Sequence, residues 1–193
     1  MADGTGSAAP SRIGPVRFLA GVELKRAHVE DIVARVSRRL AVPCHLDPAP
    51  WACTPVHLSG RDQVDADLLL ASLDGPVEPG SIRVGLTGLD LGLPIFTYVF
   101  GRAHRGGHAA VVSLARLSPE RYGFPPDPDL AARRAVAEIM HELGHVAGLG
   151  HCDDFNCIMH FSPNVESIDV RGMTFCRACA DALPRNLLAE QHA

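Results

Sequence analysis

The sequence has few aromatic residues, a single lysine and no long apolar run. Aromatic residues make up 5% of its 193 positions, although 47% of the chain is hydrophobic, so we expect a mainly aliphatic core. Apart from Lys25, arginine supplies all of the permanent positive side-chain charge. The formal net charge of −4 and the isoelectric point near 6.2 leave no surplus of positive charge for a phosphate backbone. Nucleic acid is therefore not an expected partner.

Two further absences concern membranes and export. No stretch approaches the roughly 18 consecutive apolar residues that a membrane-spanning helix needs. The N-terminus also lacks a basic start followed by an apolar segment. We therefore expect a cytoplasmic protein without a membrane partner, in which the reducing environment keeps the 6 cysteines as thiols.

A chain of this length can bury one sizeable core, and a single domain is the default expectation. Residues 1–14 consist mostly of Gly, Ala, Ser and Pro without an apolar pattern, which predicts a flexible N-terminal tail. Residues 15–193 then form the single domain. A monomer is the default oligomeric state.

Apolar periodicity predicts strands alternating with helices. One helix begins at Pro128 with Asp127 as its N-cap, and its apolar stripe lies opposite His141 and His145. Two β-rich runs, residues 95–100 and 109–114, flank the pair Gly106-Gly107 and predict a hairpin. The other expected elements are strands at 16–22, 43–47 and 81–86 and helices at 23–40, 64–73 and 181–193.

Residues 141–151 combine the residue types of a catalytic metal site. His141 and His145, four residues apart on a helix, project from one face and can share one cation. Gly148 allows the helix to stop, so that His151 can supply the third nitrogen that catalytic zinc requires. Glu142 lies about 100° around the helix from His141, where it can reach a water at the open position and act as general base. The alternative is an ordinary helix with solvated or core histidines, but helix propensity does not explain the glycine and third histidine at this spacing.

A group of four cysteines follows directly. Two are close to the last histidine and two more form a C-x-x-C pair downstream, which suits a closed, tetrahedral structural zinc site. A pair of disulfides is the alternative, which the absence of an export signal disfavours. Two other cysteines, Cys44 and Cys53, stand apart and are expected to be ordinary thiols. The four predicted zinc ligands are Cys152, Cys157, Cys176 and Cys179.

These motifs resemble the signature of the archaemetzincins, a metzincin-type family of zinc-dependent metallopeptidases. The resemblance rests on H-E-L-G-H-V-A-G-L-G-H-C at residues 141–152, C-I-M at 157–159 and C-R-A-C at 176–179. The upstream segments 100–103 and 111–117 also look like the family. The resemblance covers roughly residues 80–180 clearly and the earlier part faintly.

The resemblance implies an α/β fold of metzincin type, with a twisted, mostly parallel sheet and one antiparallel edge strand that binds an extended peptide. A backing helix, an active-site helix and a zinc-stapled C-terminal portion complete this expected fold. The cofactors would be two zinc ions, one catalytic and one structural. Met159 would support the zinc ligands from beneath without binding the metal.

The expected function is hydrolysis of peptide bonds in a peptide or protein substrate, with zinc polarising the carbonyl and Glu142 moving the proton. Two other functions remain open. One is a catalytically weak, zinc-containing module that binds peptides, and the other is a hydrolase of a non-peptide amide.

Overall fold

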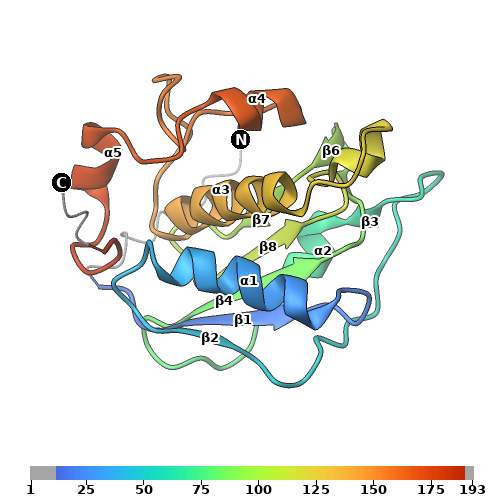
Figure 1. Cartoon of the computed structure of the whole chain (residues 1–193). Coiled ribbons are helices and arrows are strands. Elements are labelled where there is room, and N and C mark those ends of the chain that lie inside the picture. The colour runs from blue at the N-terminus through green and yellow to red at the C-terminus, as the bar shows by residue number, and fades with distance from the viewer. Residues whose placement is uncertain (1–11, 190–193) are drawn as a thin grey trace.

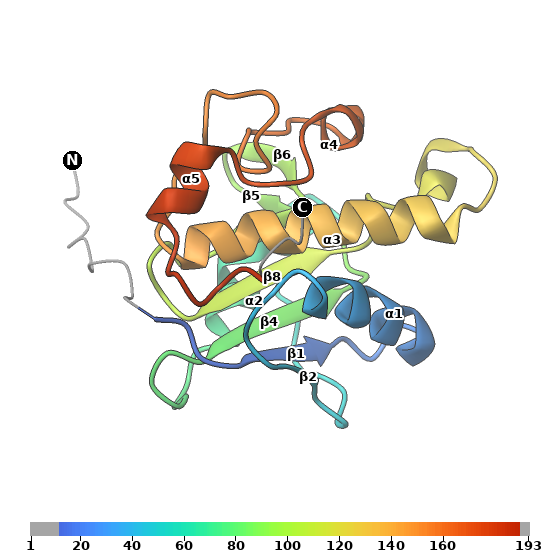
Figure 2. The ribbon, with the colours of Figure 1, turned by 60° about the vertical axis from the view of Figure 1, so that its left-hand side comes forward.

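A computed structural model describes residues 12–189, and Figures 1 and 2 show its arrangement. The five-stranded sheet has the order β2-β1-β4-β8-β7. Its first four strands are parallel, and β7 pairs with β8 in the antiparallel sense. The predicted α/β fold, with a mostly parallel sheet and one antiparallel edge strand, is therefore confirmed. The elements are β1 (Val16–Ala20), α1 (Arg26–Ser37), β2 (Cys44–Leu46), β3 (Val64–Asp65), α2 (Ala66–Ala71), β4 (Ile82–Thr87), β5 (Leu91–Leu93), β6 (Phe96–Val99), β7 (Gly101–Ala103), β8 (Ala109–Ser113), the 3-10 helix η1 (Pro119–Tyr122), α3 (Pro128–Val146), α4 (Val165–Val170) and α5 (Arg177–Ala182).

The sheet is covered on both faces because alternate residues of its central strands point to opposite sides. In β8, Ala110 and Val112 pack toward α1 and α3, whereas Ala109 and Val111 pack into a second core on the other face. That second core contains α2 and Trp51. The tryptophan ring lies where a side chain on Gly85 of β4 would be, since a Cβ there would come within 2.5 Å of it.

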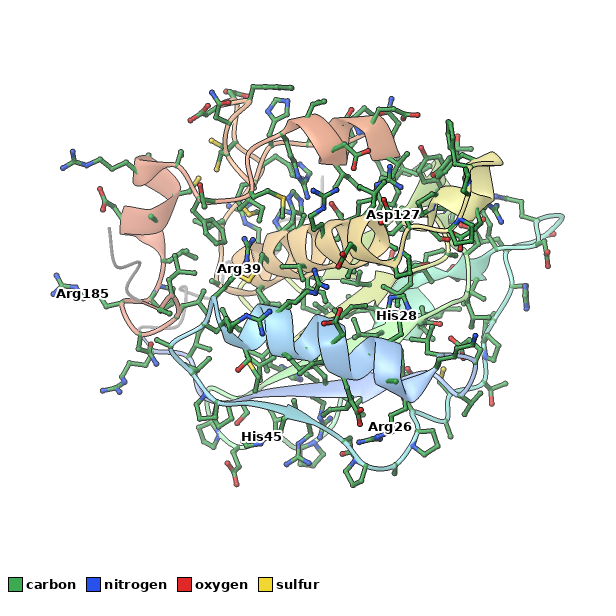
Figure 3. The ribbon with its side chains drawn as sticks, in the orientation of Figure 1. Arg26, His28, Arg39, His45, Asp127 and Arg185 are labelled. Atoms are coloured by element: carbon green, nitrogen blue, oxygen red, sulfur yellow. The ribbon has the colours of Figure 1, made fainter. Side chains whose placement is uncertain are left out.

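Helix α3 lies between the sheet and the C-terminal segment (Figure 2). It begins as predicted: Pro128 is its first residue, and the carboxylate of Asp127, labelled in Figure 3, accepts a hydrogen bond from the N–H of Leu130 at 2.9 Å. Fourteen of its 19 residues are buried. The helix therefore packs on both sides, because the chain after residue 151 returns over the face that carries the histidines.

The predicted N-terminal tail needs a correction at its inner end. Residues 1–11 lie outside the described residues. Ile13, assigned to the tail, is only 4% exposed, and its N–H donates to Asn186 Oδ1 at 3.1 Å. The N–H of Gly14 also bonds to the carbonyl of Gly80 at 2.7 Å. Residues 13 and 14 thus belong to the packed part of the protein. The side chain of Ile13 is buried, and hydrogen bonds to the side chain of Asn186 and to the carbonyl of Gly80 hold the backbone in place.

The predicted hairpin and the last predicted helix also differ from the structure. The edge strand that pairs with β8 is β7, residues 101–103, whereas β6 pairs with β5 in a separate three-stranded sheet of order β3-β5-β6. The last helix was predicted at residues 181–193. In the structure, α5 covers residues 177–182, with Cys176 of the second cysteine pair as its N-cap. Residues 190–193 of that prediction lie outside the described part. Among residues 12–189, no helix is long and apolar enough to span a membrane.

Candidate metal centres

Three histidines meet at the C-terminal end of α3. His141 and His145 project from its last turns, and His151 follows a reversal of the chain. Gly148 makes this reversal with a φ of +99°, a conformation that other residues rarely adopt. One ring nitrogen of each histidine lies within 4.8 Å of the other two. The structure thus brings together the three residues predicted to share one ion.

Hydrogen bonds leave the inner nitrogens of two rings available to a cation. The Nδ1 atoms of His141 and His145 lie 2.8 and 2.9 Å from the carbonyl oxygens of Ile158 and Leu149. Because a carbonyl only accepts, each Nδ1 carries the proton and each Nε2 presents a lone pair. The two Nε2 atoms are 3.1 Å apart, where lone pairs repel unless a cation lies between them. Tetrahedral zinc holds its nitrogen ligands about 3.3 Å apart, so the donor set fits zinc.

Burial favours the neutral form of these rings. It is the main cause that lowers the pKa of His141 well below its ordinary value, and it lowers the pKa of His145 and His151 as well. Nearby cationic groups act in the same direction, Arg171 for His141 and His151 and Arg105 for His145. Neutral imidazole is the form that binds a metal ion.

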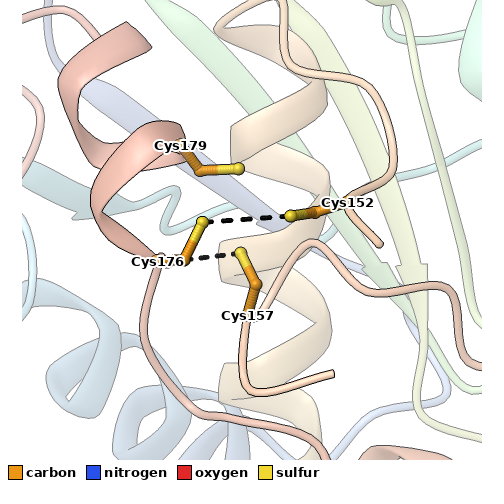
Figure 4. Close-up of side chains that lie close together, drawn as sticks. All are labelled: Cys152, Cys157, Cys176 and Cys179. Atoms are coloured by element: carbon orange, nitrogen blue, oxygen red, sulfur yellow. Dashed lines mark hydrogen bonds between the residues drawn. The ribbon is translucent and has the colours of Figure 1, made fainter. Parts of the chain in front are cut away.

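The four cysteines predicted to bind structural zinc also lie together. Their sulfur atoms are all within 4.8 Å of one another, and the Sγ atoms of Cys152 and Cys176 are 3.9 Å apart (Figure 4). Tetrahedral zinc with bonds of about 2.3 Å places its sulfurs about 3.8 Å apart. None of these thiols is in a disulfide, which would bring sulfurs in pairs to about 2 Å. The N–H of Cys179 lowers the pKa of the Cys176 thiol, whereas burial raises the pKa of the Cys157 and Cys179 thiols.

The two clusters are connected through Met159. This residue is fully buried, and its carbonyl accepts a hydrogen bond from the N–H of Cys152 at 3.0 Å. Its side chain occupies the space beside Gly144, one residue before His145, where a Cβ would come within 2.4 Å of the sulfur. The backbone N–H of Met159 in turn donates to the sulfur of Cys157 at 3.4 Å. The loop that carries the cysteines is therefore packed directly against the helix that carries the histidines.

Comparison with known proteins identifies the family. The profile described as "Peptidase family M54" matches residues 72–185, more than half of the chain. This chain belongs to peptidase family M54. The predicted resemblance to the archaemetzincins is thereby confirmed, since the curated relatives carry that name.

Two archaemetzincin sequences illustrate the similarity. The chain is 48% identical to the protein from Pyrococcus horikoshii over 104 residues, which span 54% of this chain and 55% of that protein. It is 45% identical to the protein from Methanopyrus kandleri over 127 residues, which span 66% of this chain and 69% of that protein. The first alignment thus covers little more than half the length of the relative.

Solved archaemetzincin structures match over most of the chain. The crystal structure from Archaeoglobus fulgidus, complexed with malonate, has a TM-score of 0.74 at 29% identity and covers 89% of this chain and 100% of that one. The structure from Methanopyrus kandleri has a TM-score of 0.69 at 33% identity and covers 91% and 96%. The sheet and helices described above are therefore those of this family.

In this M54 chain, Glu142 lies in the same cavity as the histidines. The cavity has a volume of about 440 Å³ and is lined by the three histidines, Glu142, and residues of β6 and β7. Glu142 is 5% exposed, and burial raises the pKa of its carboxyl well above the ordinary value, with Glu138 acting in the same direction. The described residues form no hydrogen bond or ion pair with its carboxylate. A carboxyl in this environment holds a proton more readily than one in water.

Three residues that line this cavity were not predicted from the sequence. Gly101 of β7 lies against Glu142, since a Cβ on this glycine would come within 2.6 Å of Oε1. Glu138 and Arg171 form a buried ion pair in the wall of the cavity. Glu138 lies three residues before His141 on the buried helix, which is a weak local signal for a position at the site. Arg171 and Gly101 are far from the motif in sequence, so only the fold reveals them.

Proposed function

We propose that this chain is a zinc metallopeptidase that hydrolyses peptide bonds, with Glu142 as the general base. The observation that carries the proposal is the convergence of three imidazoles beside a buried carboxylate that has no hydrogen-bond or ion-pair partner within residues 12–189. Family membership supports it. His141, His145 and His151 would hold the catalytic zinc ion.

Zinc bound at these histidines supplies Lewis acidity, which polarises a carbonyl group and makes a water molecule acidic near neutral pH. Glu142 then takes the proton from the attacking water and delivers it to the nitrogen of the leaving amine.

The edge strand β7 would hold the substrate backbone. It pairs with β8 on one side only, so the described sheet ends there. An extended peptide can add to such an edge through main-chain hydrogen bonds. This arrangement would place the scissile bond beside Glu142, because Gly101 of the same strand contacts that side chain.

We also propose a second, structural zinc ion at the four cysteines. Such a site would contribute folding free energy directly and hold the loop that bears Met159 and His151. Thiols that remain reduced are typical of the cytoplasm, which is the location we propose. The expected partner is a peptide or protein substrate, with no role for nucleic acid.

The proposal is tested by metal analysis and by turnover of a peptide library. Protein purified without added metal should contain two zinc ions per chain. The parent should cleave library peptides, and Glu142→Ala should retain zinc but lose turnover. Glu30→Ala, a change of an exposed glutamate on α1, serves as the matched control.

Three results would contradict parts of this proposal. Equal peptide binding without turnover in parent and variant would indicate a binding module. Turnover of a small amide but of no peptide would indicate a different hydrolase. A zinc content near one or zero would refute one or both metal sites.

A further inference from the structure

The active-site cavity contains a buried pair of opposite charges. Glu138 and Arg171 are each 4% exposed, and both line the cavity that contains the histidines and Glu142. The Nη2 of Arg171 donates to Oε1 of Glu138. Charged side chains are almost never fully buried unless paired, and this pair lies at the inner end of a cavity whose rim is exposed.

Arg171 holds the opposite wall of the cavity against α3. Its Nη1 donates to the carbonyl of His160 and to the hydroxyl of Ser162, both at 3.0 Å. The pair thus joins the active-site helix to the segment that follows Met159. The shape and the charge of the inner end depend on the same two side chains.

The remaining walls on this side are mainly apolar. Leu93 and Phe100 are each 5% exposed, whereas Phe96 and Phe161 are 46% and 49% exposed and form the rim. Tyr98 closes one side, because its hydroxyl donates to the carbonyl of Pro163 at 2.9 Å. A side chain that enters from the rim passes aromatic and aliphatic groups before it reaches the ion pair.

Two features of the pair define what such a side chain meets. The pair is neutral as a whole, so a third charge beside it would remain uncompensated in a poorly hydrated place. The Nε of Arg171 is buried and has no hydrogen-bond partner among the described residues. Glu138 uses only Oε1 in the hydrogen bonds of the described residues. An acceptor oxygen of Glu138 therefore remains for a side chain in the cavity, whereas the Nε of Arg171 is too deeply buried to be reached.

We propose that the Glu138–Arg171 pair forms the floor of a side-chain pocket and selects substrates with an uncharged side chain that ends in a polar group, such as Tyr or Gln, next to the scissile bond. A hydroxyl or carboxamide can donate to Glu138, while its apolar part packs on the aromatic walls. Asp, Glu, Lys and Arg are disfavoured. This inference rests on the proposed peptidase function and names the substrate class of that site.

The test compares peptides that differ only at the residues flanking the scissile bond. These positions carry Tyr, Phe, Gln, Asp or Lys in turn, and mass spectrometry locates each cleavage. For the parent we expect kcat/KM for Tyr to exceed that for Phe, and both charged residues to be at least about tenfold poorer than Tyr. Only ratios within one protein are compared, because Glu138 also influences the pKa of Glu142 and hence overall turnover.

Two variants should shift the charge preference in opposite directions. Glu138→Gln keeps the size and a hydrogen-bond acceptor but leaves the guanidinium uncompensated, so the ratio of Asp to Lys should rise about tenfold. Arg171→Met leaves the carboxylate uncompensated, so the same ratio should fall about tenfold. A residue with a merely structural role would lower all rates together. Shifts in the same direction, or no shift in either variant, would overturn the inference.

Binding measurements separate this inference from the peptidase proposal. The same peptides, labelled with a fluorophore, are titrated against the Glu142→Ala variant. They are also titrated against two double variants, in which Glu138→Gln or Arg171→Met is added to Glu142→Ala. If the parent cleaves no peptide but the binding preference still shifts in opposite directions, the pocket stands and the peptidase proposal fails. If Arg171→Met does not fold, Glu138→Gln decides alone: a higher Asp to Lys ratio supports the pocket, and an unchanged ratio refutes it.

Discussion

Replacing Gly101 by alanine should displace Glu142, the proposed general base, while leaving the proposed zinc ligands in place. A Cβ at this position of β7 would lie 2.6 Å from Oε1, 2.8 Å from Cγ and 2.9 Å from Cδ of Glu142. Ordinary contacts of this kind begin at 3.4 Å, so the carboxylate has to move by about 0.8 Å. The neighbouring strand β8 restrains the backbone of β7, which makes movement of the side chain the easier adjustment.

The displacement sets the expected loss of activity. Misplacement of a catalytic group by about 1 Å can cost about 100-fold in rate, and we expect a fall of that order in kcat/KM for Gly101→Ala. The three imidazoles lie on α3 and on the loop after it, and Gly101 contacts none of them among its nearest atoms. Zinc content should therefore remain at the parent value.

The assay measures peptide turnover, zinc content and thermal stability of purified parent and variant side by side. Gly88→Ala is the matched control, because its Cβ would press on the glutamate side chain of Glu23, at 3.1 Å from Cγ, outside the cavity. It reports the general cost of adding a methyl group beside a carboxylate. Turnover by Gly101→Ala at the parent rate, with full zinc content, would refute the positioning of Glu142 described here.

Three further predictions concern the structure around the site. Cys176→Ser should reduce the zinc content from two ions to one and lower the melting temperature, whereas Cys44→Ser should keep both ions; a Cys176→Ser protein with parent stability would contradict the structural site. Gly144→Ala should destabilise the protein by about 1–3 kcal/mol in denaturant titration, because the new Cβ would meet the sulfur of Met159 at 2.4 Å, and an unchanged free energy of unfolding would show that the loop adjusts freely. Asp127→Ala should cost about 1 kcal/mol in the same titration by removing the N-cap of α3, while zinc content stays constant; a loss of zinc would instead link the cap to the metal site.

The convergence of the candidate metal ligands could be predicted because their pattern is local. A helix places residues four apart on one face, so the spacing of His141 and His145 specifies their geometry before any tertiary contact forms. Gly148 extends this local logic to His151 through its backbone conformation. The cysteine pattern is similar, since zinc geometry limits which spacings can converge. The role of each ligand stays a prediction until metal is measured.

Strand pairing was less predictable because partners come from different parts of the chain. The segments 96–99 and 101–103 are both extended, and residue preferences alone do not show which of them pairs with β8. The β-rich run 95–100, which contains β6, was predicted to be the hairpin partner of 109–114. In the structure the edge strand is the short β7, whose Gly101 leaves room for Glu142.

The amino-acid sequence was sufficient to predict the candidate ligands and the fold class, because both depend on repeating local geometry and on close spacing along the chain. The residues that surround the site were determined by the tertiary structure. Arg171 meets Glu138 although 33 residues separate them, and Gly101 meets Glu142 across 41 residues. Such contacts arise when distant segments pack into one core. The chemistry of the ligands is therefore local, whereas the pocket that would choose a substrate is assembled by tertiary packing.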